Sequence, residues 1–467
     1  MSLLKGYIVP HPPILVMGSE EEKAKLAVTY AGFKEINEEL KVSEAELVIL
    51  ITPHGPLFVD GLCVYDKAQN SGNFSAFGHK DITGLWDNDL SYINDLQSFS
   101  LDKDIPFVKL DPQIIKEFNL SSELDHGAMV PLKLLEEGIG SKKVVIINYG
   151  LLPVDTLYHF GQLLTRTLAA EQKNGIVIAS GDLSHCLLEE GPYGYRSEGV
   201  EFDSLYVKAF EDNRLDQLLF VEEHLLERAS ECGKRSIDIL LGAFDGIQYE
   251  TTKFSYQSPF GVGYLTGRLS PVGGSIESKL PEVINRQAEI IRKRVSEESD
   301  VVKLARKGIR YYLEEDKIYR PKEVLNIEES GQRYGVFVSL NDMGGLRGCI
   351  GSTGGIAPRV EEEIVEMGVK AATNDPRFEG VSLEELGKLT ISVDILSRSE
   401  QVINIKELDP KVYGVIAKSN HKQGLLLPDL EGIDTIESQL EIVLNKAGID
   451  PKEETYQLYK FTVKRFY

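Results

Sequence analysis

The chain lacks the features that would place it in a membrane or on nucleic acid. No apolar run approaches the roughly 18–20 residues of a membrane span, and the N-terminal residues lack the long apolar stretch of a signal peptide. Basic residues are outnumbered, 51 Lys and Arg against 73 Asp and Glu, which gives a net charge of −22. Because nucleic acids and anionic membranes both attract basic patches, we expect neither as a partner.

Cysteine is also scarce. The 467 residues contain only 4 cysteines and no CxxC pair, which excludes a disulfide framework and a zinc ribbon. We therefore expect a cytoplasmic protein whose thiols stay reduced. The cysteines are Cys63, Cys186, Cys232 and Cys349.

Histidine is rare too, with 8 residues, but half of them stand where an α/β enzyme places its functional groups. The apolar runs GYIVP, LVILITP and GIVIAS each lead into one histidine, and another lies in the sequence DHG. In open α/β sheets, ligands bind beyond the carboxyl ends of the strands. Imidazole is a common metal ligand and a general base near neutral pH. The four residues are His11, His54, His126 and His185.

The first part of the chain alternates short apolar runs with amphipathic segments, which predicts an α/β domain with a layered sheet and helices. The polar, glycine-rich stretch 67–85 is expected to form loops over the active face. The predicted strands are 6–10, 47–53, 143–148 and 175–180.

The domain organisation follows from a change in composition. Residues 271–283 are rich in proline, glycine and serine, which is typical of a linker. We therefore expect a metal-binding domain over 1–270 and a second domain over 284–467. Helices and strands segregate in the second domain, which favours an α+β fold.

Two of the histidines are candidates for metal binding. A mononuclear centre that activates oxygen needs Fe(II) held by two histidines and one carboxylate, with open positions for substrate and O₂. His11 and His54 each follow a predicted strand and lie next to prolines, which stiffen the loops that carry them.

The ordered motifs of residues 4–270 resemble those of the class III extradiol dioxygenases, the protocatechuate 4,5-dioxygenase type. The resemblance rests on the histidine after the first strand, then HG, DHG and SGDLSH. It implies that His11 and His54 bind Fe(II), that His185 is the acid/base, and that His126 lines the pocket for a catechol-like substrate. Asp182, three residues before His185, would orient that imidazole or cap a turn.

The third metal ligand departs from the family pattern. Where the family has a glutamate, this chain has Cys232, with Glu231 directly before it. In this position the chain is similar to the Memo proteins. A thiolate is a soft ligand, and two histidines with one cysteine also suit zinc or copper. Glu231 stays open as the alternative third ligand.

The second half carries the sequence LRGCIG, followed by NDPRF and GLLLP. In this order they resemble the AMMECR-type domain over about 285–467. Arg347 and Arg377 are candidates for binding an anion, and Cys349 for a nucleophile. The alternative is a glycine-rich turn that packs a small core cysteine.

The fusion resembles the arrangement of AmmeMemoRadiSam systems, in which a radical-SAM protein is a third component. Two functions remain open. The first is a mononuclear non-haem iron dioxygenase or oxidoreductase acting on an aromatic or other small molecule, which the intact histidine set favours. The second is a non-catalytic Fe-, Cu- or Zn-binding scaffold that works with a radical-SAM partner, which Cys232 favours.

Overall fold

The computed structural model describes residues 3–58, 61–342, 345–419, 421–428, 435–451 and 454–467. It divides into two compact units, Met1–Gln287 and Ala288–Tyr467, so that the boundary falls within helix α12 (Leu280–Glu297). Each unit has its own hydrophobic cores. Among the described helices, none is long and apolar enough to span a bilayer.

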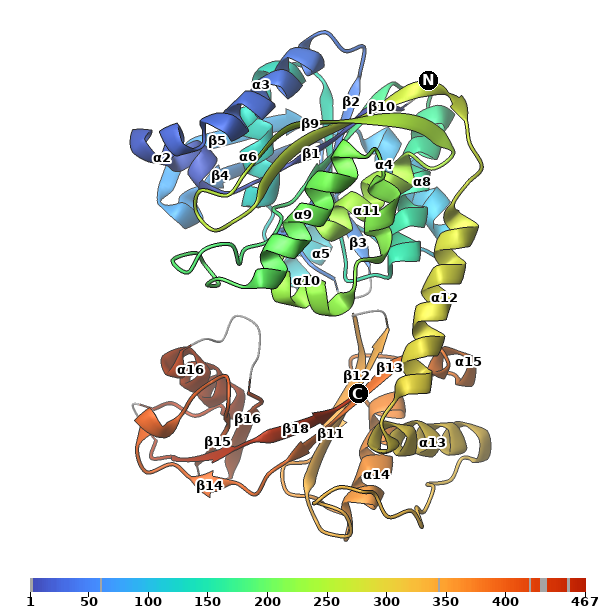
Figure 1. Ribbon diagram of the computed structural model, residues 1–467. Helices are drawn as coiled ribbons and strands as arrows, with labels where there is room; N and C mark the ends of the chain where they lie inside the picture. The colour runs from blue at the N-terminus through green and yellow to red at the C-terminus, as the bar shows by residue number, and fades with distance from the viewer. Residues whose placement is uncertain (1–2, 59–60, 343–344, 420, 429–434, 452–453) are drawn as a thin grey trace. The chain divides into compact units, whose positions relative to one another are not determined.

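The first unit is built on an eight-stranded sheet with the order β6-β3-β7-β2-β8-β1-β10-β9. Its central strands β7, β2, β8 and β1 run parallel, whereas β10 and β9 add an antiparallel ribbon at one edge (Figure 1). All the strands predicted from the apolar runs are present. The strands of this sheet are β1 (Leu3–Val9), β2 (Leu47–Thr52), β3 (Leu62–Tyr65), β6 (Phe107–Leu110), β7 (Lys143–Asn148), β8 (Gly175–Ser180), β9 (Ile247–Gln257) and β10 (Tyr264–Ser275).

Helices cover both faces of this sheet, which confirms the α/β class. Strand β2 shows why: Leu47, Ile49 and Ile51 pack into one core, and Val48 and Leu50 into the core on the opposite face. A strand buried on both faces reads as one continuous apolar run. The helices of the first core are α4 (Leu90–Leu101), α8 (Val154–Ala170), α9 (Ser197–Glu211) and α11 (Lys234–Ala243); those of the second are α3 (Ala27–Lys41), α6 (His126–Leu134) and α7 (Glu136–Ile139) (Figure 1).

The remaining elements of this unit are short. They connect the larger ones or extend over the ends of the strands. They are α1 (Ile14–Met17), α2 (Glu20–Lys25), β4 (Gln69–Phe74), η1 (Ser75–Phe77), β5 (His79–Asp87), α5 (Pro112–Glu117), η2 (Leu215–Phe220) and α10 (Glu223–Ala229).

Two expectations about irregular segments need correction. Residues 67–85, expected as loops, contain the hairpin β4–β5. Residues 271–283, expected as a linker, contain the end of β10 and the start of α12. Gly273 and Gly274 have φ of 90° and 82° inside a shift in register between β10 and β9. Glycine marks a bulge in the ribbon here.

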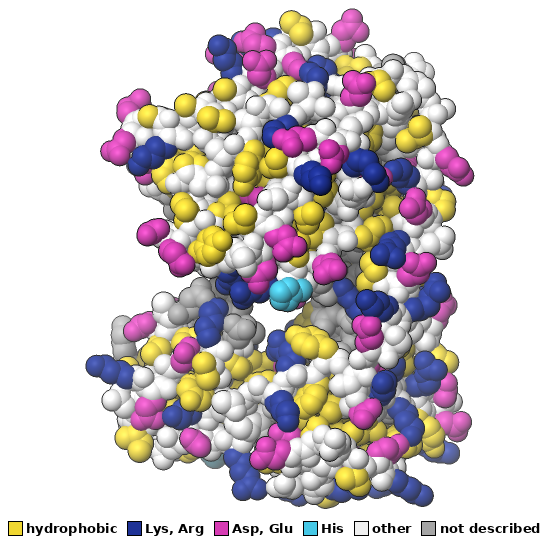
Figure 2. All heavy atoms as spheres, in the orientation of Figure 1, with side chains coloured by type: hydrophobic (Ala, Val, Ile, Leu, Met, Phe, Trp, Pro, Cys, Tyr) yellow, Lys and Arg dark blue, Asp and Glu magenta, His cyan; other side chains and the backbone are white. Residues whose placement is uncertain are grey.

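The second unit is α+β, as expected. It contains two four-stranded antiparallel sheets, with orders β12-β11-β13-β18 and β14-β17-β15-β16, and helices packed on them. On the face drawn in Figure 2, acidic and basic side chains of each unit are interspersed. The strands are β11 (Gly335–Asp342), β12 (Gly345–Gly351), β13 (Thr390–Leu396), β14 (Glu400–Gln401), β15 (Gly414–Ser419), β16 (Lys422–Leu426), β17 (Gln457–Phe461) and β18 (Val463–Phe466). The helices are α13 (Asp300–Glu315), α14 (Val360–Thr373), α15 (Leu383–Leu386), η3 (Ile405–Glu407) and α16 (Ile436–Ala447).

Candidate metal centre

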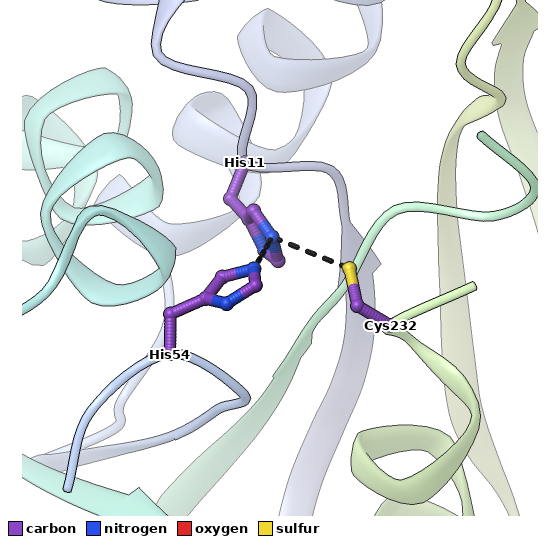
Figure 3. Close-up of side chains that lie close together, drawn as sticks. All are labelled: His11, His54 and Cys232. Carbon is purple, nitrogen blue, oxygen red and sulfur yellow. Dashed lines mark hydrogen bonds between the residues drawn. The ribbon is translucent and has the colours of Figure 1, made fainter. Parts of the chain in front are cut away.

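Three predicted ligands meet at the carboxyl edge of the parallel strands. His11 follows β1 and His54 follows β2, on either side of β8, and their Nε2 atoms lie 3.0 Å apart (Figure 3). Cys232, just before α11, places its Sγ 3.5 Å from His11 Nε2. All three ligand atoms lie within 4.8 Å of one another. Zinc–nitrogen bonds of about 2.0 Å and zinc–sulfur bonds of about 2.3 Å put tetrahedral ligands roughly 3.3–3.6 Å apart, so the set fits one ion.

Hydrogen bonding fixes the ring of His11. Its Nδ1 lies 2.9 Å from Ser180 Oγ, and that hydroxyl donates its own hydrogen to Gly127 O at 2.5 Å. The hydroxyl must therefore accept from His11 Nδ1–H, which leaves the lone pair on Nε2. A partner on the distal nitrogen is typical of histidines that bind metals.

Both histidine ligands are neutral near pH 7. Burial, and then the neighbouring histidines, hold the pKa of His11 well below its ordinary value. His54 is exposed as a residue, but its ring packs against His11 and His126, and this desolvation lowers its pKa to about 4. Metal binding requires neutral imidazole, so neither ring has to lose a proton first.

Hydrogen bonds to its backbone carbonyl and to its sulfur hold Cys232 in place. Tyr149 Oη donates to Cys232 O at 3.0 Å, and the backbone N–H of Asp182 points to Sγ at 3.3 Å. Burial raises the pKa of the Cys232 thiol well above its ordinary value, and the nearby Asp182 carboxylate raises it further. Without a metal, the cysteine is a thiol at neutral pH.

The structure does not bring Glu231, the alternative third ligand, to the two histidines. Its Oε2 accepts a hydrogen bond of 2.6 Å from the backbone N–H of Lys234, the first residue of α11. A carboxylate is stabilised at a helix N-terminus, where backbone N–H groups are free. The backbone therefore directs Glu231 to the helix and Cys232 to the two histidines.

His185 and Asp182 lie beside this centre. His185 Nδ1 donates to Ser230 O, which leaves Nε2 as the acceptor, 4.0 Å from Asp182 Oδ2. The same Oδ2 is 4.0 Å from His11 Nε2. Burial lowers the pKa of His185 and raises that of Asp182 to about 7. The two residues also form a group with Cys232 whose ligand atoms lie within 4.8 Å, so proton transfer by His185 stays a prediction.

His126, the first residue of α6, forms part of an aromatic wall. Its ring stacks on His54 with centroids 4.3 Å apart and an interplanar angle of 18°, and burial lowers its pKa. Phe77 packs against His126 at 5.5 Å, and Tyr193 lies 5.8 Å from His185. Phe77 and Tyr193 are 44% and 50% exposed, so they flank a site that is open to solvent.

The candidates of the second unit are placed differently from expectation. Cys349 lies on strand β12 and not in a turn, and its Sγ accepts from Ser339 Oγ at 3.3 Å. Arg347 pairs with Glu385 at 2.5 Å, and Arg377 pairs with Asp375 at 2.7 Å. Both guanidinium groups already have carboxylate partners, so the expected anion site is not preformed.

Asp375 forms hydrogen bonds with both Cys349 and Arg377. Its Oδ2 accepts from the backbone N–H of Cys349 at 2.8 Å as well as from Arg377. The hydrogen bond from Arg377 holds the pKa of Asp375 far below its ordinary value. Gly344, which lies just before the LRGCIG sequence, is outside the described residues.

Comparison with protein families agrees with both halves of this description. Residues 5–267 match the catalytic LigB subunit of aromatic ring-opening dioxygenase, and residues 302–466 match AMMECR1. The chain belongs to the LigB family, fused to an AMMECR1 domain. The resemblance to extradiol dioxygenases and to the AMMECR-type domain is thereby confirmed.

Relatives of the LigB–AMMECR1 chain include one with the same extent. Protein CA_C1420 of Clostridium acetobutylicum is 36% identical over 468 residues, which covers 100% of this chain and 99% of the relative. A protein of Thermotoga maritima is 45% identical over 170 residues, 36% of this chain and 98% of its own length. Among solved structures, the uncharacterized protein JW3007 from Escherichia coli K12 aligns with a TM-score of 0.40 at 15% identity, over 57% of this chain and 99% of its own.

The sequence did not identify several residues that shape the LigB centre. Ser180, the last residue of β8, had a signal, because it ends a buried strand beside β1. Tyr149 had the same kind of signal, because it directly follows β7. Ser230, Phe77 and Tyr193 had none, because their roles depend on segments that approach the sheet edge from distant parts of the chain.

Proposed function

We propose that the LigB domain is a mononuclear non-haem iron oxidoreductase that acts on a catechol-like aromatic or another small molecule. The observation that carries this proposal is the convergence of His11, His54 and Cys232 within 4.8 Å at the carboxyl edge of the sheet, with His185 beside them.

The donor set fits a divalent metal. Two neutral imidazoles present Nε2, and the thiol supplies one negative charge once it loses its proton. The LigB family points to Fe(II), whereas the thiolate also suits zinc or copper. Bound Fe(II) would supply a Lewis acid and a redox centre for O₂.

The surrounding residues have separate tasks. His185, fixed through Ser230, accepts and returns a proton at Nε2, which a neutral imidazole of lowered pKa can do at neutral pH. His126 and Phe77 offer ring faces and edges at the open side, where an aromatic substrate would pack.

Cys232 favours a second candidate. A soft thiolate in place of a carboxylate is suited to a non-catalytic zinc- or copper-binding scaffold, and such a protein would work with a radical-SAM partner. In either case we place the protein in the cytoplasm, with thiols reduced, and expect neither nucleic acid nor membrane as a partner.

Metal analysis of anaerobically purified protein, followed by O₂ uptake with a panel of catechols, separates the two. Iron together with catechol-dependent O₂ uptake supports the enzyme, whereas bound zinc or copper without uptake supports the scaffold. The His54→Ala variant should lose metal affinity by at least about ten-fold, at the low end of the roughly 10–100-fold loss measured for weaker, indirect contacts. The exposed His421 of the AMMECR1 domain provides the control variant, His421→Ala. Undiminished metal content in His54→Ala would overturn both candidates.

A further inference from the structure

The start of α6 is bonded to the turns that carry both histidine ligands. Asp125, the N-cap of α6, accepts at Oδ1 from Thr52 Oγ1 at 2.7 Å and from the backbone N–H of Ala128 at 3.2 Å. Thr52 is the last residue of β2, and its Oγ1 lies 3.5 Å from the backbone nitrogen of His54. A hydrogen-bonded path therefore leads from the helix start to the His54 turn.

A second path leads to the other ligand. Gly127 O accepts from Ser180 Oγ, and that hydroxyl accepts from His11 Nδ1. The residue between Asp125 and Gly127 is His126, whose ring stacks on His54. Residues 125–127 are thus linked to the His54 backbone through Thr52 and contact the His54 ring through His126. The same residues are linked to His11 Nδ1 through the Ser180 hydroxyl.

The close packing around this segment requires glycine at two positions. A Cβ on Gly127 would lie 2.5 Å from Thr52 Oγ1 and 2.8 Å from Asp125 Oδ1. A Cβ on Gly55 would lie 1.8 Å from Asn148 Oδ1 and 3.1 Å from Asp125 Oδ2. Only glycine permits this approach of the His54 turn to the Asp125 carboxyl group.

Capping of α6 accounts for one oxygen of the Asp125 carboxyl group, Oδ1, but not for the other. Asp125 Oδ2 is buried and has no hydrogen-bond partner among the described residues, and the same holds for Asn148 Oδ1. An unpartnered buried polar atom costs free energy. A cost retained directly behind a metal ligand indicates that Asp125 serves the geometry of the centre.

We propose that Asp125 is a positioning residue of the metal centre: through Thr52 it fixes the His54 turn, and through the start of α6 it aligns that turn with His11. The proposal rests on the metal binding assigned above, but not on ring cleavage. Displacing His54 would separate the two Nε2 atoms, which lie 3.0 Å apart.

The test is the affinity of the full-length protein for Zn(II), measured by competition with a chromophoric chelator, together with the visible spectrum of the Co(II) form. Asp125→Ala and Thr52→Val should each weaken Zn(II) binding by about 10–100-fold, the usual effect of removing a partner behind a ligand. Thr52→Ser keeps the hydroxyl and should restore wild-type affinity. Thr167→Val is the matched control, because Thr167 is equally buried and donates only to Leu163 O within α8.

The Co(II) spectrum distinguishes positioning from general destabilisation. Its bands should shift in Thr52→Val and stay unchanged in Thr167→Val. If Asp125→Ala does not fold, the contrast between Thr52→Val and Thr52→Ser decides. Wild-type affinity in Thr52→Val, or an equal loss in Thr167→Val, overturns the positioning role while metal binding stands. A wild-type protein that binds no metal overturns both.

Discussion

Metal binding should release a proton from Cys232, and this makes the affinity depend on pH. Burial and the Asp182 carboxylate raise the pKa of the free thiol well above the ordinary value of about 8.5. The bound form needs the thiolate, so the free protein carries one more proton than the complex. The apparent binding constant for Zn(II) should therefore rise about ten-fold, or about 1.4 kcal/mol, for each unit of pH.

The other titrating groups set the window for this measurement. His54, with a pKa of about 4, is already neutral and contributes no proton above pH 5 or so. Asp182 has a pKa raised to about 7 and lies 4.0 Å from His11 Nε2, where a bound cation would favour its charged form. Below neutral pH a second proton should be released, and the slope should increase toward two. Between about pH 7.5 and 9 the slope should be one.

Chelator competition at four or five pH values within this window gives the slope directly. Cys232→Ser should bind more weakly and show no slope, because a serine hydroxyl keeps its proton. Cys349→Ser, in the other unit, should behave as the wild type. A wild-type slope of zero, with Cys232→Ser equal to the wild type in affinity, would refute the role of Cys232 as a ligand.

Three further outcomes are expected. Lys234→Met should lower the free energy of unfolding by about 3–5 kcal/mol, because Asp238 loses its buried ammonium partner at 2.6 Å. The double variant Lys234→Met/Asp238→Leu should recover most of this loss. Urea unfolding of the full chain measures both variants. His185→Gln should keep its iron and lose O₂-dependent turnover by roughly 10²–10⁴-fold, whereas loss of iron would make His185 a ligand. A fragment Met1–Gln287 should have a higher melting temperature than a fragment that ends at residue 270. The shorter fragment truncates β10 and lacks Val283 of α12, whose burial contributes about 1.5–3 kcal/mol to the free energy of unfolding. Equal melting temperatures would place α12 outside this unit.

The central strands could be predicted because each is buried on both faces. Such a strand is a short apolar run whatever its neighbours are, and β2, β7 and β8 all have this form. Strand β9 has no such run, since most of its residues are only partly buried. In the β4–β5 hairpin, β5 is mostly exposed and β4 buries the polar Asn70 and the small Gly72, so the composition of the hairpin resembles that of a loop.

Those site residues that directly follow a strand could be predicted from the sequence. His11 and His54 follow strands, and the carboxyl ends of parallel strands meet at one edge of the sheet. The choice between Glu231 and Cys232 could not be made, because adjacent residues point in different directions and only the start of α11 decides which one faces the two histidines. Likewise, nothing in the sequence shows that Asp375 would engage both Cys349 and Arg377.

With Cys232 as the proposed third ligand in place of a carboxylate, the centre would differ in its chemistry but not in its formal charge. Two neutral histidines with one thiolate carry the same single negative charge as two histidines with one carboxylate. Asp182 lies next to Cys232, and after burial its carboxylate is the group that raises the pKa of the Cys232 thiol further. Without a cation, the thiol holds its proton, and Asp182, with a pKa of about 7, is only partly ionised at neutral pH. A bound divalent ion would stabilise both anions at once. Electrostatics would therefore serve any divalent metal equally, and the softness of sulfur is what selects among iron, zinc and copper at this site.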